Sequence, residues 1–102
     1  MIHVIATISL QPGSRAAFLQ AFHELMPLVH EEVGCIEYGP AIDVDAGLPN
    51  GPALRDDVVV VVEKWESTAA LRDHLQAPHM TTYRAQVREL VISTQIQVLE
   101  PA

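Results

Sequence analysis

Hydrophobic positions alternate along residues 2–10 and then change to a helical spacing. Ile2, Val4, Ala6, Ile8 and Leu10 share one face of the first segment, which predicts a β-strand that ends at Pro12 and Gly13. From Ser14, a candidate N-cap, Phe18, Phe22, Leu25 and Val29 recur at helical spacing. This pattern predicts a helix to about Gly34. Pro27 predicts a kink or break near residues 23–27, because proline removes a backbone hydrogen bond.

The middle of the chain predicts two further strands, joined by a long loop. Residues 35–44 form the first, and Pro40 favours an edge position because proline cannot donate to a central ladder. The Gly- and Pro-rich segment DAGLPNGPALRD, residues 45–56, is long for a connection and is typical of a functional, partner-contacting or mobile loop. Five consecutive valines then open a strand over residues 58–65, which predicts a strand with both faces buried.

The last third predicts a helix in two pieces and a final strand. Ser67 can cap a short helix to Gln76, and Pro78 opens another helix. The inner side of that second helix carries Met80, Tyr83, Val87, Leu90 and Val91. Residues 92–99 form the last strand. The order β-α-β-β-α-β predicts one α+β domain over residues 1–102, with the four-stranded antiparallel sheet of the ferredoxin-like class.

The valine run also bears on assembly. Helices cover only one face of such a sheet, whereas Val58, Val60 and Val62 would share the other face with Ile5. A second sheet, most simply that of an identical subunit, would cover them and make a homodimer. The alternative is that the long loop covers them.

Composition narrows the classes of partner. Six Lys and Arg residues stand against 13 Asp and Glu, a net charge of −7, and the basic residues do not cluster. Neither nucleic acid nor an anionic membrane is therefore an expected partner. A single cysteine excludes an intramolecular disulfide framework and suits a reducing, cytoplasmic location. The apolar N-terminus alternates and lacks a basic flank, so it is read as a strand and not as a signal peptide.

The segment EKWESTAALRDHLQAPHM, residues 63–80, contains the candidate chemistry. Strand alternation places Trp65 on the same face as Glu63, and His74, His79 and Tyr83 follow on the two short helices. An apolar cleft with a few polar groups is typical of a small-molecule site. The alternative is that Trp65 belongs to the core and that His74 is a solvent-exposed helix residue.

Other chemistries lack their motifs. His74 and His79 are five positions apart with Pro78 between them, and adding Glu63 still matches no standard ligand spacing, so no metal site is predicted. Cys35 has no neighbouring cation to activate it. The chain also lacks a GxSxG turn and a Gly-rich phosphate loop.

Five segments carry a family resemblance in order along the chain: VIATISLQPGSRAAFLQAF, VGCIEYGP, VVVVVEKWES, LRDHLQAPHMTTY and IQVLEPA. Together they resemble the antibiotic-biosynthesis monooxygenase family, in particular its bacterial quinol monooxygenases. The resemblance implies a dimeric α/β barrel of ferredoxin-like subunits. It also implies an enzyme that oxidises quinols or small aromatic polyphenols with dioxygen and uses neither flavin nor metal.

The resemblance also assigns candidate site residues. It implies that Trp65 lines the pocket, that His74 and His79 lie at its mouth or wall, and that Tyr38 and Tyr83 contribute polar tips. A cofactor-free oxygenase needs a base to deprotonate the quinol, and histidine suits that role near neutral pH. We expect His74 or His79 as base and Tyr83 as hydrogen-bond donor, with Trp65, Tyr38, Glu63 and Met80 around the substrate.

One departure and two rival functions stay open. Ala6 stands where relatives with a monooxygenase or haem-degrading site often carry asparagine, which argues against haem degradation. The rivals are an isomerase of small signalling ketones and a non-catalytic dimeric barrel that binds an apolar ligand. Oxygen consumption with a reduced quinone would separate the oxygenase from both.

Overall fold

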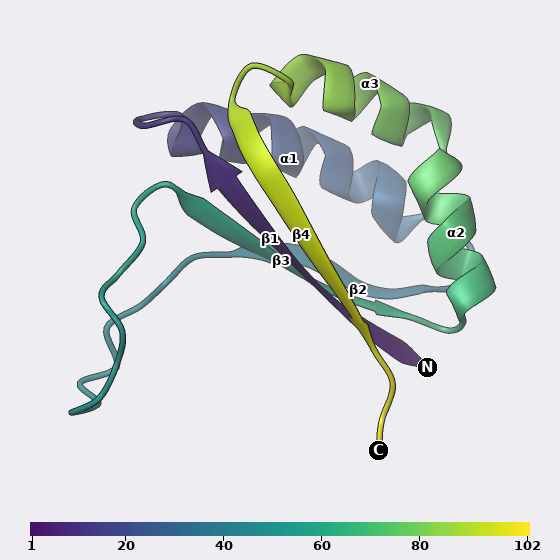
Figure 1. Ribbon diagram of the computed structural model, residues 1–102. Helices are drawn as coiled ribbons and strands as arrows, with labels where there is room; N and C mark the ends of the chain where they lie inside the picture. The colour runs from purple at the N-terminus through teal and green to yellow at the C-terminus, as the bar shows by residue number, and fades with distance from the viewer.

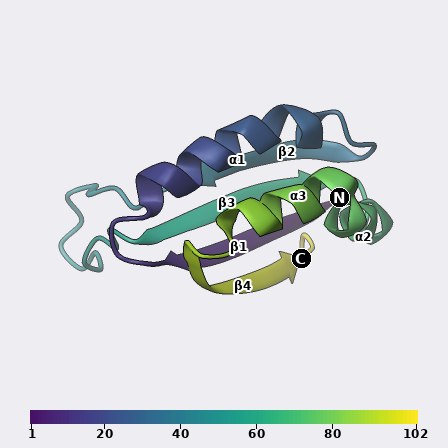
Figure 2. The ribbon, with the colours of Figure 1, turned by 90° about the horizontal axis from the view of Figure 1, so that it is seen from above.

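A computed structural model describes residues 1–102 and places four strands in one sheet with three helices on one of its faces (Figures 1 and 2). The elements are β1 (Ile2–Leu10), α1 (Arg15–His30), β2 (Cys35–Ala41), β3 (Val58–Trp65), α2 (Thr68–Gln76), α3 (Pro78–Val87) and β4 (Val91–Leu99). Every strand pair is antiparallel and the strand order is β2-β3-β1-β4. The predicted α+β ferredoxin-like fold is confirmed, and Pro40 lies on an edge strand as expected.

The core lies between the sheet and α1. Alternate residues of β1 are buried, and β1 pairs with both neighbours, so that Ala6 lies opposite Val61 of β3 and Ile96 of β4. Phe18 and Phe22 of α1 pack onto this face with no exposed surface. Burial of one such ring contributes about 2–3 kcal/mol, so the apolar stripe of α1 is the main reason the helix docks.

Two expectations for α1 need correction. The helix runs unbroken through Pro27, which lies on its exposed side, where water can satisfy the carbonyl that proline leaves unpaired. The helix also ends at His30 and not near Gly34. Residues 31–34 instead form a turn, in which Cys35 N–H donates to the carbonyl of Glu32, and Gly34 adopts a φ of +88°. This turn fixes the position of Glu32.

The β2–β3 connection begins earlier than expected. β2 ends at Ala41, paired with Val60, rather than at Val44. Residues 42–57 then extend beyond the end of the sheet (Figures 1 and 2). Arg55 holds the two arms of this loop together through hydrogen bonds of 2.9 Å to both carboxylate oxygens of Asp43.

The two faces of β3 differ in their surroundings. Val59 and Val61 are buried beneath the helices, as are Glu63 and Trp65. On the other face Val58 and Val60 are only partly covered, and Val62 is 39% exposed. Within one chain, therefore, only the helix-facing side of β3 is buried as predicted. The opposite side stays partly exposed.

The second helical segment is divided in two, as predicted. The Ser67 hydroxyl accepts a hydrogen bond from Ala70 N–H at the start of α2, and Pro78 is the first residue of α3 after the extended Ala77. α3 ends at Val87, so Leu90 and Val91 do not lie on its inner side, and Val91 instead begins β4. None of the helices has the length and apolar character needed to cross a membrane.

Candidate active site

A cavity of about 450 Å³ lies between the sheet and the helices α2 and α3 and extends to β4. We call it the main cavity. Most of its lining is hydrophobic and includes Ala6, Ile8, Phe22, Val61, Val87 and Ile96. Its polar lining comes from Tyr38, Glu63, His74, Tyr83, Arg84, Arg88 and Thr94. An apolar cavity with a few polar groups suits a small organic molecule that carries hydroxyl or carbonyl groups.

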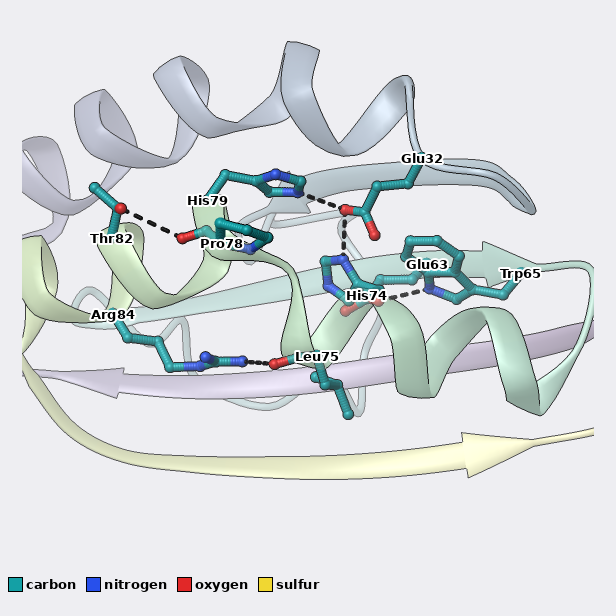
Figure 3. A network of polar contacts seen from close by, with 9 residues as sticks. All are labelled: Glu32, Glu63, Trp65, His74, Leu75, Pro78, His79, Thr82 and Arg84. Atoms are coloured by element: carbon teal, nitrogen blue, oxygen red, sulfur yellow. Dashed lines mark hydrogen bonds and ion pairs between the residues drawn. The ribbon is translucent and has the colours of Figure 1, made fainter.

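His74, one of the cavity's polar groups, is held from behind by a carboxylate. Its Nδ1 lies 2.8 Å from Oε2 of Glu32, in the turn between α1 and β2 (Figure 3). His79 Nε2 lies 2.8 Å from the same oxygen. An ionised carboxylate only accepts hydrogen bonds, so each of these ring nitrogens donates its proton. In a neutral His74 ring, Nε2 is then the basic nitrogen.

The surroundings of His74 favour its neutral form. The ring is 1% exposed, packed 4.6 Å from the Trp65 ring and 5.2 Å from the Tyr38 ring, measured between centroids. Burial lowers the pKa of His74 below its ordinary value, and the hydrogen bond and charge of Glu32 oppose that decrease. The protein thus presents a neutral imidazole, oriented by a carboxylate, at the cavity wall.

Glu63 is a second ionisable group at the same end of the cavity. Its Oε1 accepts a hydrogen bond of 2.8 Å from the indole Nε1–H of Trp65 (Figure 3). Burial raises the pKa of Glu63 to about 7, the hydrogen bond from Trp65 works against that increase, and the charge of Glu32 adds to it. Near neutral pH this carboxyl group can therefore hold or release a proton.

Two tyrosines lie on different sides of the cavity. Tyr38 of β2 stacks on Phe22 with a centroid distance of 5.3 Å, and Tyr83 of α3 meets Phe22 edge to face at 6.0 Å. Burial raises the pKa of both hydroxyls above the ordinary value for tyrosine. Both therefore remain protonated near neutral pH and can donate hydrogen bonds.

Two arginine side chains, one from α3 and one from the residue that follows it, border the cavity as well. Arg84 donates a hydrogen bond to the backbone carbonyl of Leu75 in α2, which fixes its guanidinium beside the cavity (Figure 3). Its positive charge contributes to the lowered pKa of His74. Arg88 lies one helical turn further along the lining.

The structure brings most of the predicted site residues to one cavity. Tyr38, Glu63, His74, Met80 and Tyr83 all line it. Trp65 does not line it, which corrects that expectation: its ring is fully buried behind the cavity wall, packed on His74 and bonded to Glu63. His79 lies outside as well, at a separate hollow of about 200 Å³ between α1 and α3, because the start of α3 turns its side chain toward Glu32.

Two residues of the site, Glu32 and Arg84, are not predicted by the sequence patterns. Glu32 is 42 residues from His74, in a turn that the helical pattern assigned to a helix, so no local spacing connects the two. Arg84 follows Tyr83 directly. Its position next to this inward-facing residue was the one signal in the sequence that could have indicated it. No group of three or more His, Cys, Asp or Glu side chains is arranged to hold a metal ion.

The fold and site define a ferredoxin-like α+β protein with a largely apolar cavity between its sheet and its helices. Residues 1–86 match the family described as "Antibiotic biosynthesis monooxygenase", and the chain belongs to that family. It is 40% identical over 103 residues to "Probable quinol monooxygenase YgiN" of Escherichia coli, covering 99% of this chain and 98% of the relative.

Solved structures agree with this assignment. Rv0793 from Mycobacterium tuberculosis superposes with a TM-score of 0.79 at 28% identity, covering 99% of this chain and 94% of the other. PA3566 from Pseudomonas aeruginosa shares the fold, with a TM-score of 0.81 at 23% identity and coverage of 99% and 93%. Family membership supports the coarse assignment of the chain as a monooxygenase.

Proposed function

We propose that this protein is a cofactor-free monooxygenase that oxidises a quinol, or a small polyphenol of similar shape, with dioxygen. The observation that carries the proposal is His74 at the wall of an apolar cavity, with its Nδ1–H bonded to Glu32 and its Nε2 left as the basic nitrogen. The name of the Escherichia coli relative supports a quinol as the substrate.

In this mechanism the protein supplies a base and a largely apolar cavity, and the substrate supplies the electrons. His74 Nε2 takes the proton of a quinol hydroxyl, and Tyr83 donates a hydrogen bond to the resulting phenolate. The phenolate gives one electron to dioxygen, which produces a semiquinone and superoxide, and these two radicals combine. The ring-bound peroxide takes back the proton that His74 holds and becomes a hydroperoxide. Loss of the hydrogen on the same ring carbon, with cleavage of the O–O bond, then releases one oxygen atom as water and leaves the other on a hydroxyquinone. The apolar part of the cavity wall favours retention of dioxygen next to the substrate ring.

The test is oxygen uptake by metal-stripped protein with a panel of reduced quinones. The activity should exceed the rate of quinol autoxidation, and its pH profile should rise through the pKa of His74, because the base must be neutral. His74→Gln should lower turnover about 10²- to 10⁴-fold. His23→Gln is the matched control, since His23 is an exposed histidine of α1. Full activity in His74→Gln would exclude this residue as the base.

His79 is expected to behave differently from His74 in the same assay. It lies outside the main cavity and is not placed to take the substrate proton directly. His79→Gln should therefore retain most of the turnover at the plateau of the pH profile. A loss as large as that of His74→Gln would identify His79 as the base instead.

A second candidate function, isomerisation of a small ketone, is favoured by one observation. The pKa of Glu63 is about 7, so a carboxyl group that can still carry its proton lines the same cavity as the neutral His74. Such an acid and base could isomerise a hydroxyketone through its enediol: His74 would remove the proton of the carbon that carries the hydroxyl group while Glu63 protonates the carbonyl oxygen. Return of the proton to the former carbonyl carbon then exchanges the two groups. Deuterium exchange into a ketone, without oxygen uptake, would favour the isomerase. If the protein catalyses neither reaction but binds the same compounds saturably, it is a binding protein.

A further inference from the structure

Glu32 is the one carboxylate that contacts both histidines of the site region. It lies on the turn after α1, and its side chain is 13% exposed. His74 reaches its Oε2 from the last turn of α2, and His79 reaches the same oxygen from the first turn of α3, each at 2.8 Å (Figure 3). The extended Ala77 and the helix start at Pro78 separate α2 from α3, so the two imidazoles approach Glu32 from different helices.

We propose that Glu32 is the positioning residue that aims Nε2 of His74 into the main cavity, and that His79 sets how much of the Glu32 charge acts on His74. This inference rests on the proposed role of His74 as base. Glu32 fixes the tautomer, because only Nδ1–H of His74 can donate to it. It also stabilises the imidazolium that forms when His74 takes the substrate proton.

Because the two histidines share one oxygen of Glu32, they compete for its negative charge. The side chain of His79 is 22% exposed and borders the outer hollow, so it can exchange protons with solvent, whereas His74 is buried. A proton on His79 places a positive charge 2.8 Å from the oxygen that stabilises His74. Glu32 then compensates the charge of His79, and less of its negative charge remains to stabilise a protonated His74.

The other groups around His74 act in known directions. Arg84 of α3 and His79 disfavour its protonated form, and Glu32 favours that form. Glu63 of β3 also lines the cavity, but its carboxyl group is hydrogen-bonded to Trp65 and not to His74. Tyr38 of β2 packs edge-on against the ring and remains neutral near neutral pH. Glu32 is therefore the carboxylate in direct contact with His74, and its removal should be seen directly in the basicity of that ring.

Two substitutions should shift the His74 titration in opposite directions. Glu32→Gln keeps an oxygen acceptor but removes the charge, so the pKa of His74 should fall further and the acid limb of the activity profile should move to lower pH. Turnover at the plateau should fall as well, by up to about 10⁴-fold, the loss known for changing the carboxylate that orients a catalytic histidine into an amide. His79→Gln keeps a donor toward Glu32 but cannot become charged, so the pKa of His74 should rise.

The measurement is nitrogen-15 NMR of the histidine side chains across pH, which reports pKa and tautomer without any need for activity. Glu31→Gln is the matched control, because Glu31 precedes Glu32 on the same turn but is exposed. It should leave the titration of His74 unchanged. Opposite shifts in the two variants, with His74 protonated at Nδ1 in the wild type, are the expected result.

Unchanged titration in both variants, or shifts in the same direction, would overturn the inference. The proposed function fails separately: a wild-type protein without oxygen uptake but with the expected opposite shifts would still have Glu32 as the positioning residue of His74. Should Glu32→Gln fail to fold, His79→Gln alone decides, because an unchanged or lowered pKa of His74 in that variant contradicts the competition for Glu32.

Discussion

At the scale of single residues, the ionisation of Glu63 makes the free energy of unfolding depend on pH. Its pKa rises from 4.5 to about 7 on folding, so the folded protein holds this proton more tightly than the unfolded chain does. The resulting stabilisation is fully present below pH 4.5 and is lost as the pH rises toward 7. The shift corresponds to about 3 kcal/mol as an order of magnitude, because one pKa unit is worth about 1.4 kcal/mol.

Glu63→Gln should therefore flatten the pH dependence of the free energy of unfolding. The amide oxygen can still accept the hydrogen bond of Trp65, but the side chain no longer ionises. Urea denaturation at pH 5 and pH 8 should show a smaller loss of stability in the variant than in the wild type. Glu89→Gln, an exposed control, should retain the wild-type difference. Equal losses in Glu63→Gln and the wild type would mean that Glu63 is ionised without cost.

The spacing of residues along the strands and helices predicted part of the site. Strand alternation put Glu63 and Trp65 on one face, and the inward face of α3 gave Met80 and Tyr83, all of which the structure places as that pattern predicts. The contact between Glu32 and His74 could not be predicted, because it depends on how a turn after α1 meets the end of α2. The position of Trp65 behind the wall likewise depends on packing depth, which alternation does not encode.

At the scale of elements, the turn that carries Glu32 is fixed by its approach to α2. A Cβ on Gly34 would lie 2.6 Å from Cβ of Ala70, and the φ of +88° already favours glycine. Gly13 offers a comparison: its φ is +77°, but a Cβ there would meet nothing within 4 Å. Both glycines share the backbone requirement, and only Gly34 has the steric one.

Gly34→Ala should thus destabilise the protein more than Gly13→Ala. The backbone strain should cost roughly 1–2 kcal/mol at either position. The clash with Ala70 should add about 1–3 kcal/mol at Gly34, the usual range for overpacking. Thermal and urea unfolding measure both. In a double-mutant cycle, Ala70→Gly should recover the added part of the loss. Equal costs at the two glycines would show that the turn can move away from α2.

The elements themselves were predictable wherever a period was long and clear. The alternation of β1 and the helical stripe of α1 gave both elements, with the start of α1 within one residue. The ends were less predictable, because strand pairing and turn formation decide them. β2 stops at Ala41, where its last partner in β3 lies, although the apolar alternation continues to Val44.

At the scale of the whole molecule, the face of the sheet opposite the helices bears on assembly. Ile5 and Val62 are paired across β1 and β3 on that face, next to Val60, and Val62 is 39% exposed. The segment 42–57 extends beyond the end of the sheet. We therefore retain the prediction of a homodimer that packs sheet against sheet.

Sedimentation at micromolar concentration should give the mass of a dimer. Val60→Lys should produce a monomer with unchanged circular dichroism, because a charge would have to be buried between the two sheets. Gln86→Lys, on the exposed side of α3, adds the same charge elsewhere and should remain dimeric. A wild-type protein that sediments as a monomer would contradict the prediction.

The central place of β1 in the sheet has a consequence for biosynthesis. This strand pairs with β3 on one side and β4 on the other, and Val4 lies opposite Val98. At about 5–20 residues per second, a ribosome needs roughly 5–20 seconds to add the residues between these two partners. During that time β4 is still missing, so the edge of β1 that pairs with β4 is unpaired and the apolar face of the sheet is incomplete. Completion of the native sheet must therefore wait for β4 to leave the exit tunnel. Chaperones that bind short apolar strands can bind β1 during this interval.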